Sequence, residues 1–315
     1  MRLAILADIH GNLPALEAVL GKLEELQPDY VLVNGDLINV APFSNQVIER
    51  VRQLGWTVVR GNHEFYYLDY VCGRSPGDYS DPVRWGQLHW LVNHITPANG
   101  NYLAMLPDDL SVHLPGFQPF RMTHGVPGRN RVGFQPHHND ADIAAEIKDV
   151  GEHTLLSAHS HQQIDRHVPR PAVASESWIE PAPHDFCHVI NPGSIGLPLN
   201  RDPKAQFAIM ESTSESESAG GWKATFYRLD YDRRPALEAF TTSGMMAAGG
   251  VMSQLFYWQL VTADHEIIRF LRWSREHGHD SDANIRAAFA AYVSATARDQ
   301  YVRQQDPLYQ SNSCV

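Results

Sequence analysis

Five apolar runs in the first half of the chain each end on side chains that can bind a metal ion. Short runs rich in Val, Ile and Leu predict buried strands, and the ligands of open α/β sheets gather beyond the carboxyl ends of the strands. The sequence therefore predicts one edge crowded with oxygen and imidazole ligands and no thiolate, which suits hard or borderline divalent metals. The runs end at Asp8-Ile9-His10, Asp36, Asn62-His63-Glu64, His124 and His159-Ser160-His161.

Such a ligand set could hold two cations. Two divalent metals about 3.5–4 Å apart can stabilise both the attacking and the leaving oxygen of an in-line phosphoryl displacement. Because cations at that distance repel each other, an anionic oxygen must bridge them, and we expect Asp36 to do so. The remaining ligands divide into a set of Asp8, His10 and one late histidine, and a set of Asn62, His124 and the other late histidine.

The two late histidines and His63 have separate expected roles. His159 and His161 are two residues apart, so on an extended segment they point to opposite sides and could serve one cation each. A water molecule that bridges both metals would have a lowered pKa and would be the nucleophile. His63 follows a ligand and points away from it, so it could protonate the leaving oxygen or stabilise the phosphoryl charge.

Each of these residues also has an ordinary structural interpretation. Asp and Asn favour turns after strands, yet together with four histidines in the right order the ligand interpretation is favoured by at least roughly ten to one. Asn12 is predicted to cap a helix rather than to bind substrate. The loop cations Arg129 and Arg131 and the pair His137-His138 are expected to be solvated surface groups.

The pattern of elements predicts an α/β chain. Strands at 29–33 and 57–60 alternate with helices at 12–26 and 44–54, which indicates a parallel sheet. An aromatic-rich stretch then predicts a helical excursion beside the sheet. It is followed by further strands, by a polar loop with the sequence STSESESAGG, and by a linker with the sequence SGMMAAGG. The ranges expected are an excursion at 65–107 with a helix at 81–94, strands at 110–114, 120–123, 186–190, 206–211 and 223–229, and helices at 140–150, 264–277 and 283–303.

The acidic composition argues against nucleic-acid binding as the main function. The 315 residues carry a net charge of -11, from 25 Lys and Arg against 36 Asp and Glu, whereas proteins that hold nucleic-acid backbones are usually basic. A small phosphorylated substrate remains compatible, because metals supply local positive charge. The 3 scattered Cys form no disulfide framework. With no signal sequence and no long apolar span, we expect a cytoplasmic protein that does not enter membranes.

The ordered motifs D-x-H, G-D, G-N-H-E, H-G and x-H-S-H resemble the calcineurin-like metallophosphoesterase superfamily. The segments ADIHGNLPALEAVL and NPGSIGLPLNRDP look like its small bacterial and archaeal phosphodiesterase-like branch, and the resemblance covers residues 1–231. It implies a four-layer αββα sandwich of two mixed sheets flanked by helices, in a domain at 1–240. A C-terminal helical extension at 241–315 would follow, and could pack on the domain, cover the site or form a homo-oligomer contact.

The resemblance also implies the ligand sets and the metals. Asp36 would bridge, and His63 would be the acid-side histidine. The metal would most often be Mn²⁺, with Fe, Zn²⁺, Ni²⁺ or Mg²⁺ as alternatives. The first metal would be held by Asp8, His10, Asp36 and His161, and the second by Asp36, Asn62, His124 and His159.

Two positions depart from the family pattern. Ala158 stands where a Gly usually precedes the final His-x-His, which would cost energy only if that residue needs a positive φ. Asn39, Val40 and Ala41 stand where Ser/Thr protein phosphatases carry Asp-Arg-Gly. The phosphate-clamping Arg is therefore absent, and a protein phosphatase is disfavoured.

The sequence thus predicts a hydrolase that cleaves phosphomonoesters or phosphodiesters by in-line attack of a metal-bridging hydroxide. One alternative is a diadenosine polyphosphate hydrolase acting on a nucleotide, which relatives with that activity and the aromatic excursion suggest. A second is a non-catalytic protein-binding scaffold, because the superfamily includes a retromer subunit of that kind. Scaffolds of this type have lost their ligands, and all seven ligand positions are intact here.

Overall fold

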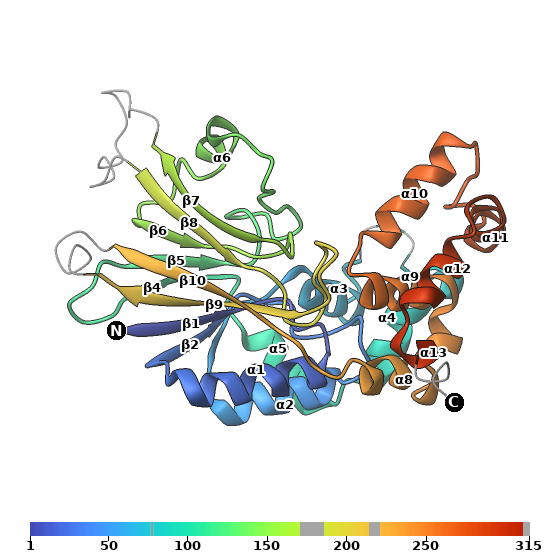
Figure 1. Ribbon diagram of the computed structural model, residues 1–315, viewed down its shortest axis with the longest axis horizontal. Coiled ribbons are helices and arrows are strands. Elements are labelled where there is room, and N and C mark those ends of the chain that lie inside the picture. The colour runs from blue at the N-terminus through green and yellow to red at the C-terminus, as the bar shows by residue number, and fades with distance from the viewer. Residues whose placement is uncertain (76, 78, 171–185, 214–220, 311–315) are drawn as a thin grey trace.

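Two five-stranded mixed sheets form the centre of the protein, with helices on both outer faces (Figure 1). The computed structural model describes residues 1–75, 77, 79–170, 186–213 and 221–310. The predicted four-layer αββα sandwich is confirmed. Most of the predicted polar loop STSESESAGG lies outside the described residues.

The first sheet contains the amino-terminal strands. Its strand order is β10-β9-β1-β2-β3, in which β1, β2 and β3 run parallel while β9 and β10 run antiparallel to their neighbours. The third strand is shorter than the predicted 57–60, because only two of its residues pair with β2. The bounds are β1 Arg2–Leu6, β2 Tyr30–Val33, β3 Thr57–Val58, β9 Ala205–Ser212 and β10 Trp222–Leu229.

The second sheet has the order β4-β5-β6-β8-β7, with β5, β6 and β8 parallel. Strand β7 was not predicted. It is an edge strand in which only Ile164 and Val168 are buried apolar residues, so it lacks the apolar run that signals a strand. The bounds are β4 Asp109–Val112, β5 Phe120–Thr123, β6 Thr154–Leu156, β7 Gln163–Pro169 and β8 Phe186–Pro192.

Three apolar layers hold the sandwich together. One lies between the two sheets and includes Leu3, Met122 and Trp222. A second lies under the first sheet, against α1 (Leu13–Leu26) and α2 (Ser44–Leu54), and a third lies between the second sheet and α6 (Asp140–Glu146). Helix α1 begins as predicted, because the Asn12 side chain accepts a hydrogen bond from the Ala15 N–H at 3.2 Å.

The aromatic excursion is helical, as predicted. It consists of α3 (Asn62–Val71), α4 (Pro82–His94) and α5 (Pro97–Met105). The Asp81 side chain caps α4 by accepting from the Val83 N–H at 2.8 Å. Helix α3 starts directly on the predicted ligand Asn62, so the excursion grows out of the candidate site.

The C-terminal helices, α8 to α13, form a second lobe beside the sandwich (Figure 1). The prediction of a linker at SGMMAAGG is wrong, because these residues begin α9, which kinks at Gly250 (φ 52°). The predicted helix 283–303 is broken at Ala297, whose φ is 50°. The division of the chain at residue 240 stays a prediction. The helix bounds are α8 Arg234–Thr242, α9 Met245–Thr262, α10 Glu266–Glu276, α11 Ile285–Thr296, α12 Arg298–Gln305 and α13 Pro307–Gln310.

Among the described helices, none combines the length with the apolar character that crossing a lipid bilayer requires.

Candidate metal centre

Five parallel strands deliver the predicted ligands to one edge of the sandwich. Strands β1, β2 and β3 come from the first sheet, and β5 and β6 come from the second. Because the ligands follow the carboxyl ends of these strands, side chains more than 150 residues apart meet between the two sheets. All seven predicted ligands are brought together there: Asp8, His10, Asp36, Asn62, His124, His159 and His161.

The backbone turns sharply at most of these ligands. Five of them have a left-handed conformation, with φ between 51° and 66°. That region costs an L-residue roughly 1–2 kcal/mol, and such strain clusters at functional sites. Ala158 is absent from the residues with positive φ, so the Ala at this position is harmless. The five are Asp8, His10, Asp36, His159 and His161.

Asp8, His10 and His161 form one group of candidate ligands. His10 Nε2 lies 3.2 Å from His161 Nε2, and His161 Nε2 lies 3.4 Å from Asp8 Oδ1. All three side chains are almost completely buried. Their ligand atoms therefore converge on one point, as the first predicted set requires.

Asn62, His124 and His159 form a second group beside it. Asn62 Oδ1 lies 2.9 Å from His124 Nε2 and 2.7 Å from His159 Nδ1. His159 thus presents its Nδ1, whereas the other histidines of the centre present Nε2. The late histidines belong to different groups, as their two-residue spacing predicts.

Asp36 lies between the two groups. Its Oδ2 is 3.6 Å from His10 Nε2 in the first group and 3.4 Å from His124 Nε2 in the second. Its Oδ1 accepts a hydrogen bond from the His63 backbone N–H at 2.8 Å, at the start of α3. One carboxylate oxygen is therefore held by the protein, and the other faces both groups.

Backbone carbonyls orient three of the ligand rings. His124 Nδ1 donates to the Asn34 carbonyl at 2.7 Å, and His161 Nδ1 donates to the Leu197 carbonyl. The His10 Nδ1 faces the Ile38 carbonyl at 3.4 Å. Since Nδ1 carries the proton in such a bond, Nε2 is free to offer its lone pair to an ion.

Burial keeps most of these imidazoles neutral. It lowers the pKa of His161 to about 3 and that of His159 to about 4, and it holds the pKa of His10 well below its usual range. Neutral imidazole is the form that binds metals. These three rings are therefore ready for an ion at neutral pH.

The central charges depend on one another. Burial raises the pKa of Asp8 well above its usual value. Burial acts on Asp36 in the same direction, but the neighbouring His124, His63 and His10 together outweigh it and hold the Asp36 pKa well below its usual range. For His124, burial lowers the pKa, and the Asp36 carboxylate reverses this and raises it to about 10. Without a bound ion, Asp36 and His124 thus form a buried charged pair, and a metal ion at His124 Nε2 would displace the proton from that nitrogen.

The donor set fits divalent cations. Both carboxylate oxygens of Asp8 and Oδ2 of Asp36 are buried, and no described residue is their hydrogen-bond partner. A buried carboxylate oxygen without a partner is costly. An ion among these oxygens and the neighbouring imidazoles would satisfy them, and the absence of thiolates suits hard or borderline metals.

His63 stands beside the centre with a defined tautomer. Its ring lies 4.7 Å from the His10 ring, centroid to centroid. The Asn39 Oδ1 accepts hydrogen bonds from the Val40 N–H at 2.8 Å and from Gln87 Nε2 at 3.2 Å. The Asn39 amide nitrogen must then donate to His63 Nδ1, at 2.8 Å. Burial lowers the pKa of His63, so the neutral ring carries its proton on Nε2.

Sequence reasoning missed several residues that support the ligands. The Asn34 amide donates to the carbonyls of Thr123 at 2.8 Å and Leu156 at 2.9 Å, and so joins β2 to β5 and β6. The Asn191 amide donates to the Ala158 carbonyl at 2.9 Å and holds the turn that carries the late histidines. Neither residue stands out in the sequence, because an isolated Asn after a strand is an ordinary turn residue.

Glu64 was also missed as a supporting residue. Both of its carboxylate oxygens accept backbone hydrogen bonds, from Asp36 at 2.9 Å, Leu37 at 2.8 Å and Gly61 at 2.7 Å. Burial and the nearby Asp36 charge raise its pKa to about 7. The available signal was the Glu three positions after Gly61, which is the spacing of a capping box.

The remaining polar candidates lie outside the ligand groups. Arg129 pairs with Glu146, and Arg131 pairs with Asp69 at 3.2 Å, so neither is a free cation. His137 belongs to none of the candidate metal groups formed by the described residues. The prediction of ordinary surface roles therefore agrees with the structure.

Comparison with known proteins decides the family. The calcineurin-like phosphoesterase profile matches residues 1–163. The chain belongs to the calcineurin-like phosphoesterase family. It is therefore a metal-dependent phosphoesterase, a hydrolase, and its groups of Asp and His are candidates for the metal site of the family.

Relatives of this phosphoesterase include an uncharacterised protein from Methanocaldococcus jannaschii. It is 25% identical over 236 residues, which is 75% of this chain and 90% of the relative. A symmetrical bis(5'-nucleosyl)-tetraphosphatase from Pectobacterium carotovorum is 34% identical over 82 residues, which is 25% of this chain and 29% of that enzyme. The second match is local and covers a small part of either protein.

Solved structures share the fold of this phosphoesterase. A metallophosphoesterase from Sphaerobacter thermophilus aligns with a TM-score of 0.61 at 22% identity, covering 83% of this chain and 98% of that one. A hypothetical protein from Pyrococcus horikoshii aligns with a TM-score of 0.63 at 22% identity, covering 81% and 97%. At this identity the similarity concerns the fold.

Proposed function

We propose that this phosphoesterase hydrolyses small phosphate esters at a centre of two divalent metal ions. Asp8, His10 and His161 would hold one ion, and Asn62, His124 and His159 the other. Asp36 would bridge them. The observation that carries this proposal is the buried Asp36 Oδ2, which has no hydrogen-bond partner among the described residues and faces both ligand groups at 3.4–3.6 Å.

The metals, when bound, would lower the pKa of water and neutralise the charge of the phosphoryl group. The chain's own residues would position the rest. His63 offers a fixed Nε2–H at the edge of the centre, because its Nδ1 is occupied by Asn39. That N–H would donate a hydrogen bond to a phosphoryl oxygen or to the leaving oxygen.

We propose manganese as the most suitable metal, with Fe, Zn, Ni or Mg as alternatives. The ligands are carboxylate, amide and imidazole groups, which accept several of these cations. Geometry and supply then select among them. Metal analysis of the protein as purified would identify the native ion.

A second candidate function is hydrolysis of dinucleoside polyphosphates. The observation that favours it is the 82-residue match to a symmetrical bis(5'-nucleosyl)-tetraphosphatase. Both candidates use the same metal centre and differ in the organic group of the ester. Release of ADP from diadenosine tetraphosphate, compared with cleavage of a nitrophenyl ester, would separate them.

The first test is an activity assay with bis(p-nitrophenyl) phosphate and Mn²⁺. We expect turnover by the wild type and a loss of at least about 10³-fold in Asp36→Asn, because the bridging charge is removed. Asp202→Asn is the control, because this carboxylate pairs with Arg228 at 3.0 Å and belongs to none of the candidate metal groups of the described residues. If the wild type cleaves neither this diester nor the monoester p-nitrophenyl phosphate with Mn, Fe, Zn, Ni or Mg, the proposal fails.

A further inference from the structure

A cavity of about 390 Å³ adjoins the metal centre on the side of His63. Its polar end is formed by Asn62, His63 and Asn39. The His63 ring lies between His10 of the centre and Phe256 of the cavity wall, with ring centroids 4.7 Å and 6.4 Å away. A group bonded to a phosphate at the centre would therefore extend past His63 into this cavity.

The remaining walls are largely apolar. Aromatic rings line one part, with Tyr66 5.5 Å from His63 and 6.4 Å from Trp85. Such partly buried rings and aliphatic groups around a small cavity are typical of sites for organic ligands. The aliphatic part of the wall is formed by Leu88, Met252, Ile267, Leu271 and Ile285.

The polar side chains of the cavity mostly have partners within the protein. Gln87 donates to the Val40 carbonyl at 3.2 Å and accepts from the Ser253 hydroxyl at 2.9 Å. Arg84 is paired with Asp282. These groups are therefore not free to bind a second charge, so the cavity suits an uncharged group.

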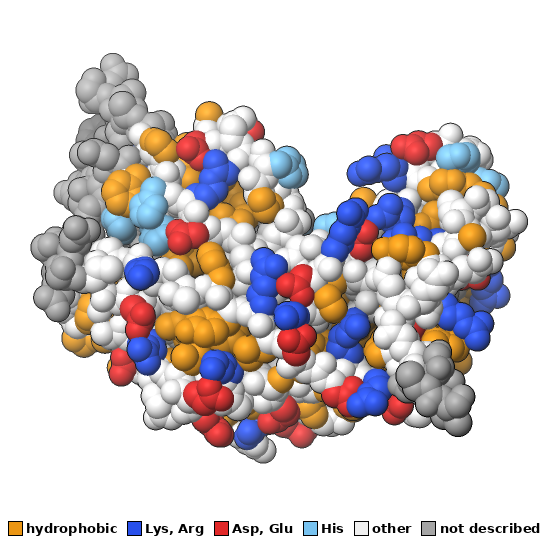
Figure 2. All heavy atoms as spheres, viewed as in Figure 1, with side chains coloured by type: hydrophobic (Ala, Val, Ile, Leu, Met, Phe, Trp, Pro, Cys, Tyr) orange, Lys and Arg blue, Asp and Glu red, His pale blue; other side chains and the backbone are white. Residues whose placement is uncertain are grey.

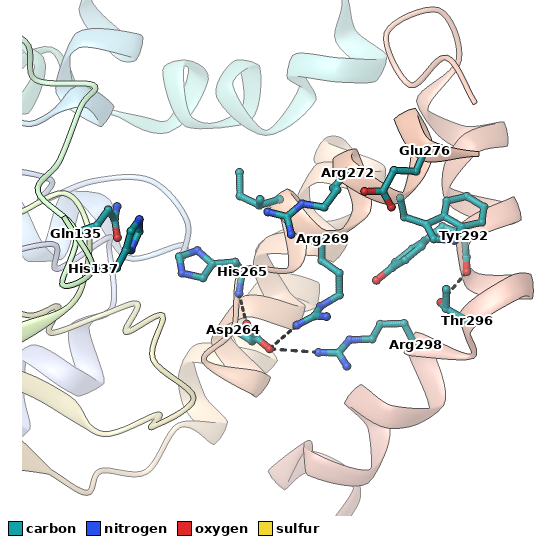
Figure 3. A pocket seen from close by; sticks show the side chains of 12 residues that line it. Gln135, His137, Asp264, His265, Arg269, Arg272, Glu276, Tyr292, Thr296 and Arg298 are labelled. Carbon is teal, nitrogen blue, oxygen red and sulfur yellow. Dashed lines mark hydrogen bonds and ion pairs between the residues drawn. The ribbon is translucent and has the colours of Figure 1, made fainter. Parts of the chain in front are cut away.

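Helix α10 separates this cavity from a wider polar cleft. Ile267 and Leu271 face the cavity, whereas Ile268 and Arg272 face the cleft. The cleft, about 800 Å³, lies between α10 and the segment that carries His137 (Figure 3). Figure 2 shows the molecule hollowed between the sandwich and the C-terminal lobe.

Close packing holds the C-terminal wall in place. Helix α9 approaches α4 so closely that a Cβ on Gly86 would lie 2.2 Å from the Ala248 carbonyl oxygen. A Cβ on Gly249 would lie 2.9 Å from the Gln87 side chain. These contacts place Met252 and Phe256 opposite the excursion helices. The cavity is therefore built jointly by the excursion and the C-terminal helices.

We propose that this cavity binds an uncharged, ring-bearing organic group of the phosphate ester, stacked among Tyr66, Trp85 and Phe256. The inference rests on the proposed phosphoesterase function and assigns its substrate class. The C-terminal helices then determine specificity, because α9, α10 and α11 supply Met252, Phe256, Ile267, Leu271 and Ile285 to the wall. Esters with small aliphatic groups would leave these apolar side chains in contact with water and would bind more weakly.

The ring could be a nucleobase or another aryl group. Recognition of a base by its hydrogen-bonding edge needs free donors and acceptors. Gln87 and Asn39 are already engaged with each other at 3.2 Å. Stacking on the aromatic walls works for any flat ring, so the proposal concerns aryl groups in general.

Two phosphonates test the cavity without hydrolysis. Phenylphosphonate and methylphosphonate share a head group and differ in the ring, and their dissociation constants are measured by calorimetry on the Mn²⁺-loaded full chain. We expect the phenyl compound to bind at least about tenfold more tightly, because the ring buries apolar surface. The preference should fall to about threefold or less in Leu271→Ala and in Phe256→Ala.

The matched control is Ile268→Ala, because this residue is 52% exposed and lies on the opposite face of the same helix. It should keep the full preference. Equal binding of both phosphonates by the wild type, or an unchanged preference in both cavity variants with native far-UV circular dichroism, would overturn the inference. Failure of the metal centre is distinguishable, because neither phosphonate would then bind and no ester would be cleaved.

A further pair identifies the source of the ring. Adenosine 5'-monophosphate and ribose 5-phosphate differ only in the base. If the base improves binding as much as the phenyl ring does, and Leu271→Ala removes the gain, the ring is a nucleobase and the class narrows to nucleotides. If only the phenyl ring improves binding, the class is that of simple aryl esters, and the inference stands in that form.

Discussion

The carboxylate of Glu64 accepts a hydrogen bond from the backbone N–H of Asp36 at 2.9 Å. The same carboxylate binds the N–H groups of Leu37 and Gly61. These bonds hold Asp36 in its left-handed conformation, at φ 55°. The oxygen that faces both ligand groups is therefore positioned by a residue that reaches neither group itself.

Replacement of Glu64 by Gln should disturb the centre without removing a ligand. Gln carries an NH2 group in place of one carboxylate oxygen. That group cannot accept a hydrogen bond from a backbone N–H, so at least one hydrogen bond to a charged group is lost. We expect the free energy of unfolding to fall by about 2–3 kcal/mol and the Mn²⁺ affinity to fall by about 10–100-fold. Urea unfolding and calorimetry measure the two effects.

The control is Glu25→Gln, because Glu25 is an exposed residue that pairs with Lys22 on the surface. It should leave both quantities unchanged. If Glu64→Gln kept full metal affinity, the supporting role of Glu64 would be wrong.

His63→Ala should lower kcat by about 10²–10³-fold, because a preorganised hydrogen-bond donor is removed. The neutral tautomer, with Asn39 donating to Nδ1, would make His63 a hydrogen-bond donor to the phosphoryl group rather than a source of a full proton. Phenyl phosphate and p-nitrophenyl phosphate should therefore lose activity by similar factors.

These two esters discriminate between the roles. A general acid matters more for the poor leaving group, so a much larger loss with phenyl phosphate would show that His63 protonates the leaving oxygen. His137→Ala is the control, because His137 lies outside the candidate centre.

The stability of the metal-free protein should depend on His159 below neutral pH. Burial lowers the pKa of this residue in the folded protein to about 4, against an ordinary value of 6.5. As the pH falls below 6.5, the unfolded chain binds a proton that the folded chain does not, so the folded state loses stability. Between pH 7 and pH 5 this single residue should lower the free energy of unfolding by about 2 kcal/mol.

Other buried groups titrate in the same range. The pKa of Glu64 is raised to about 7 by burial, against an ordinary value of 4.5. Between these values the folded chain binds the extra proton, so Glu64 makes the free energy of unfolding rise as the pH falls. The prediction therefore concerns the difference between wild type and His159→Gln, measured by urea unfolding with a chelator. As the pH falls, the free energy of unfolding of the variant should rise relative to that of the wild type. Parallel plots of this free energy against pH would contradict the prediction.

Gly86→Ala should loosen the C-terminal wall of the cavity. The added Cβ would lie 2.2 Å from a backbone oxygen of α9, which must move away. We expect a loss of about 1–3 kcal/mol in the free energy of unfolding, together with a weaker preference for phenylphosphonate. Gly21→Ala in α1 is the matched control, because nothing lies within 4 Å of its added Cβ. It should be neutral or stabilising by up to about 1 kcal/mol.

Local sequence was sufficient for the first half of the fold. Each candidate ligand follows an apolar strand, and an apolar run can be recognised from adjacent residues in the sequence. Asn12 indicated the start of the helix that it caps. The linker prediction at SGMMAAGG failed because glycines favour loops locally. In the folded protein Gly249 allows α9 to approach α4, and that contact spans more than 150 residues.

The sequence alone determined the chemistry of this protein: two Asp, an Asn and four His at the ends of buried strands predict a dinuclear phosphoesterase centre. The tertiary structure decided how those groups are arranged. It joined His10 to His161, placed Asp36 between two ligand groups, and gave Glu64 and Asn34 supporting roles. It also brought Phe256 and Leu271 to the edge of the centre. Ligand type is a property of single residues, whereas a cavity depends on how distant helices pack.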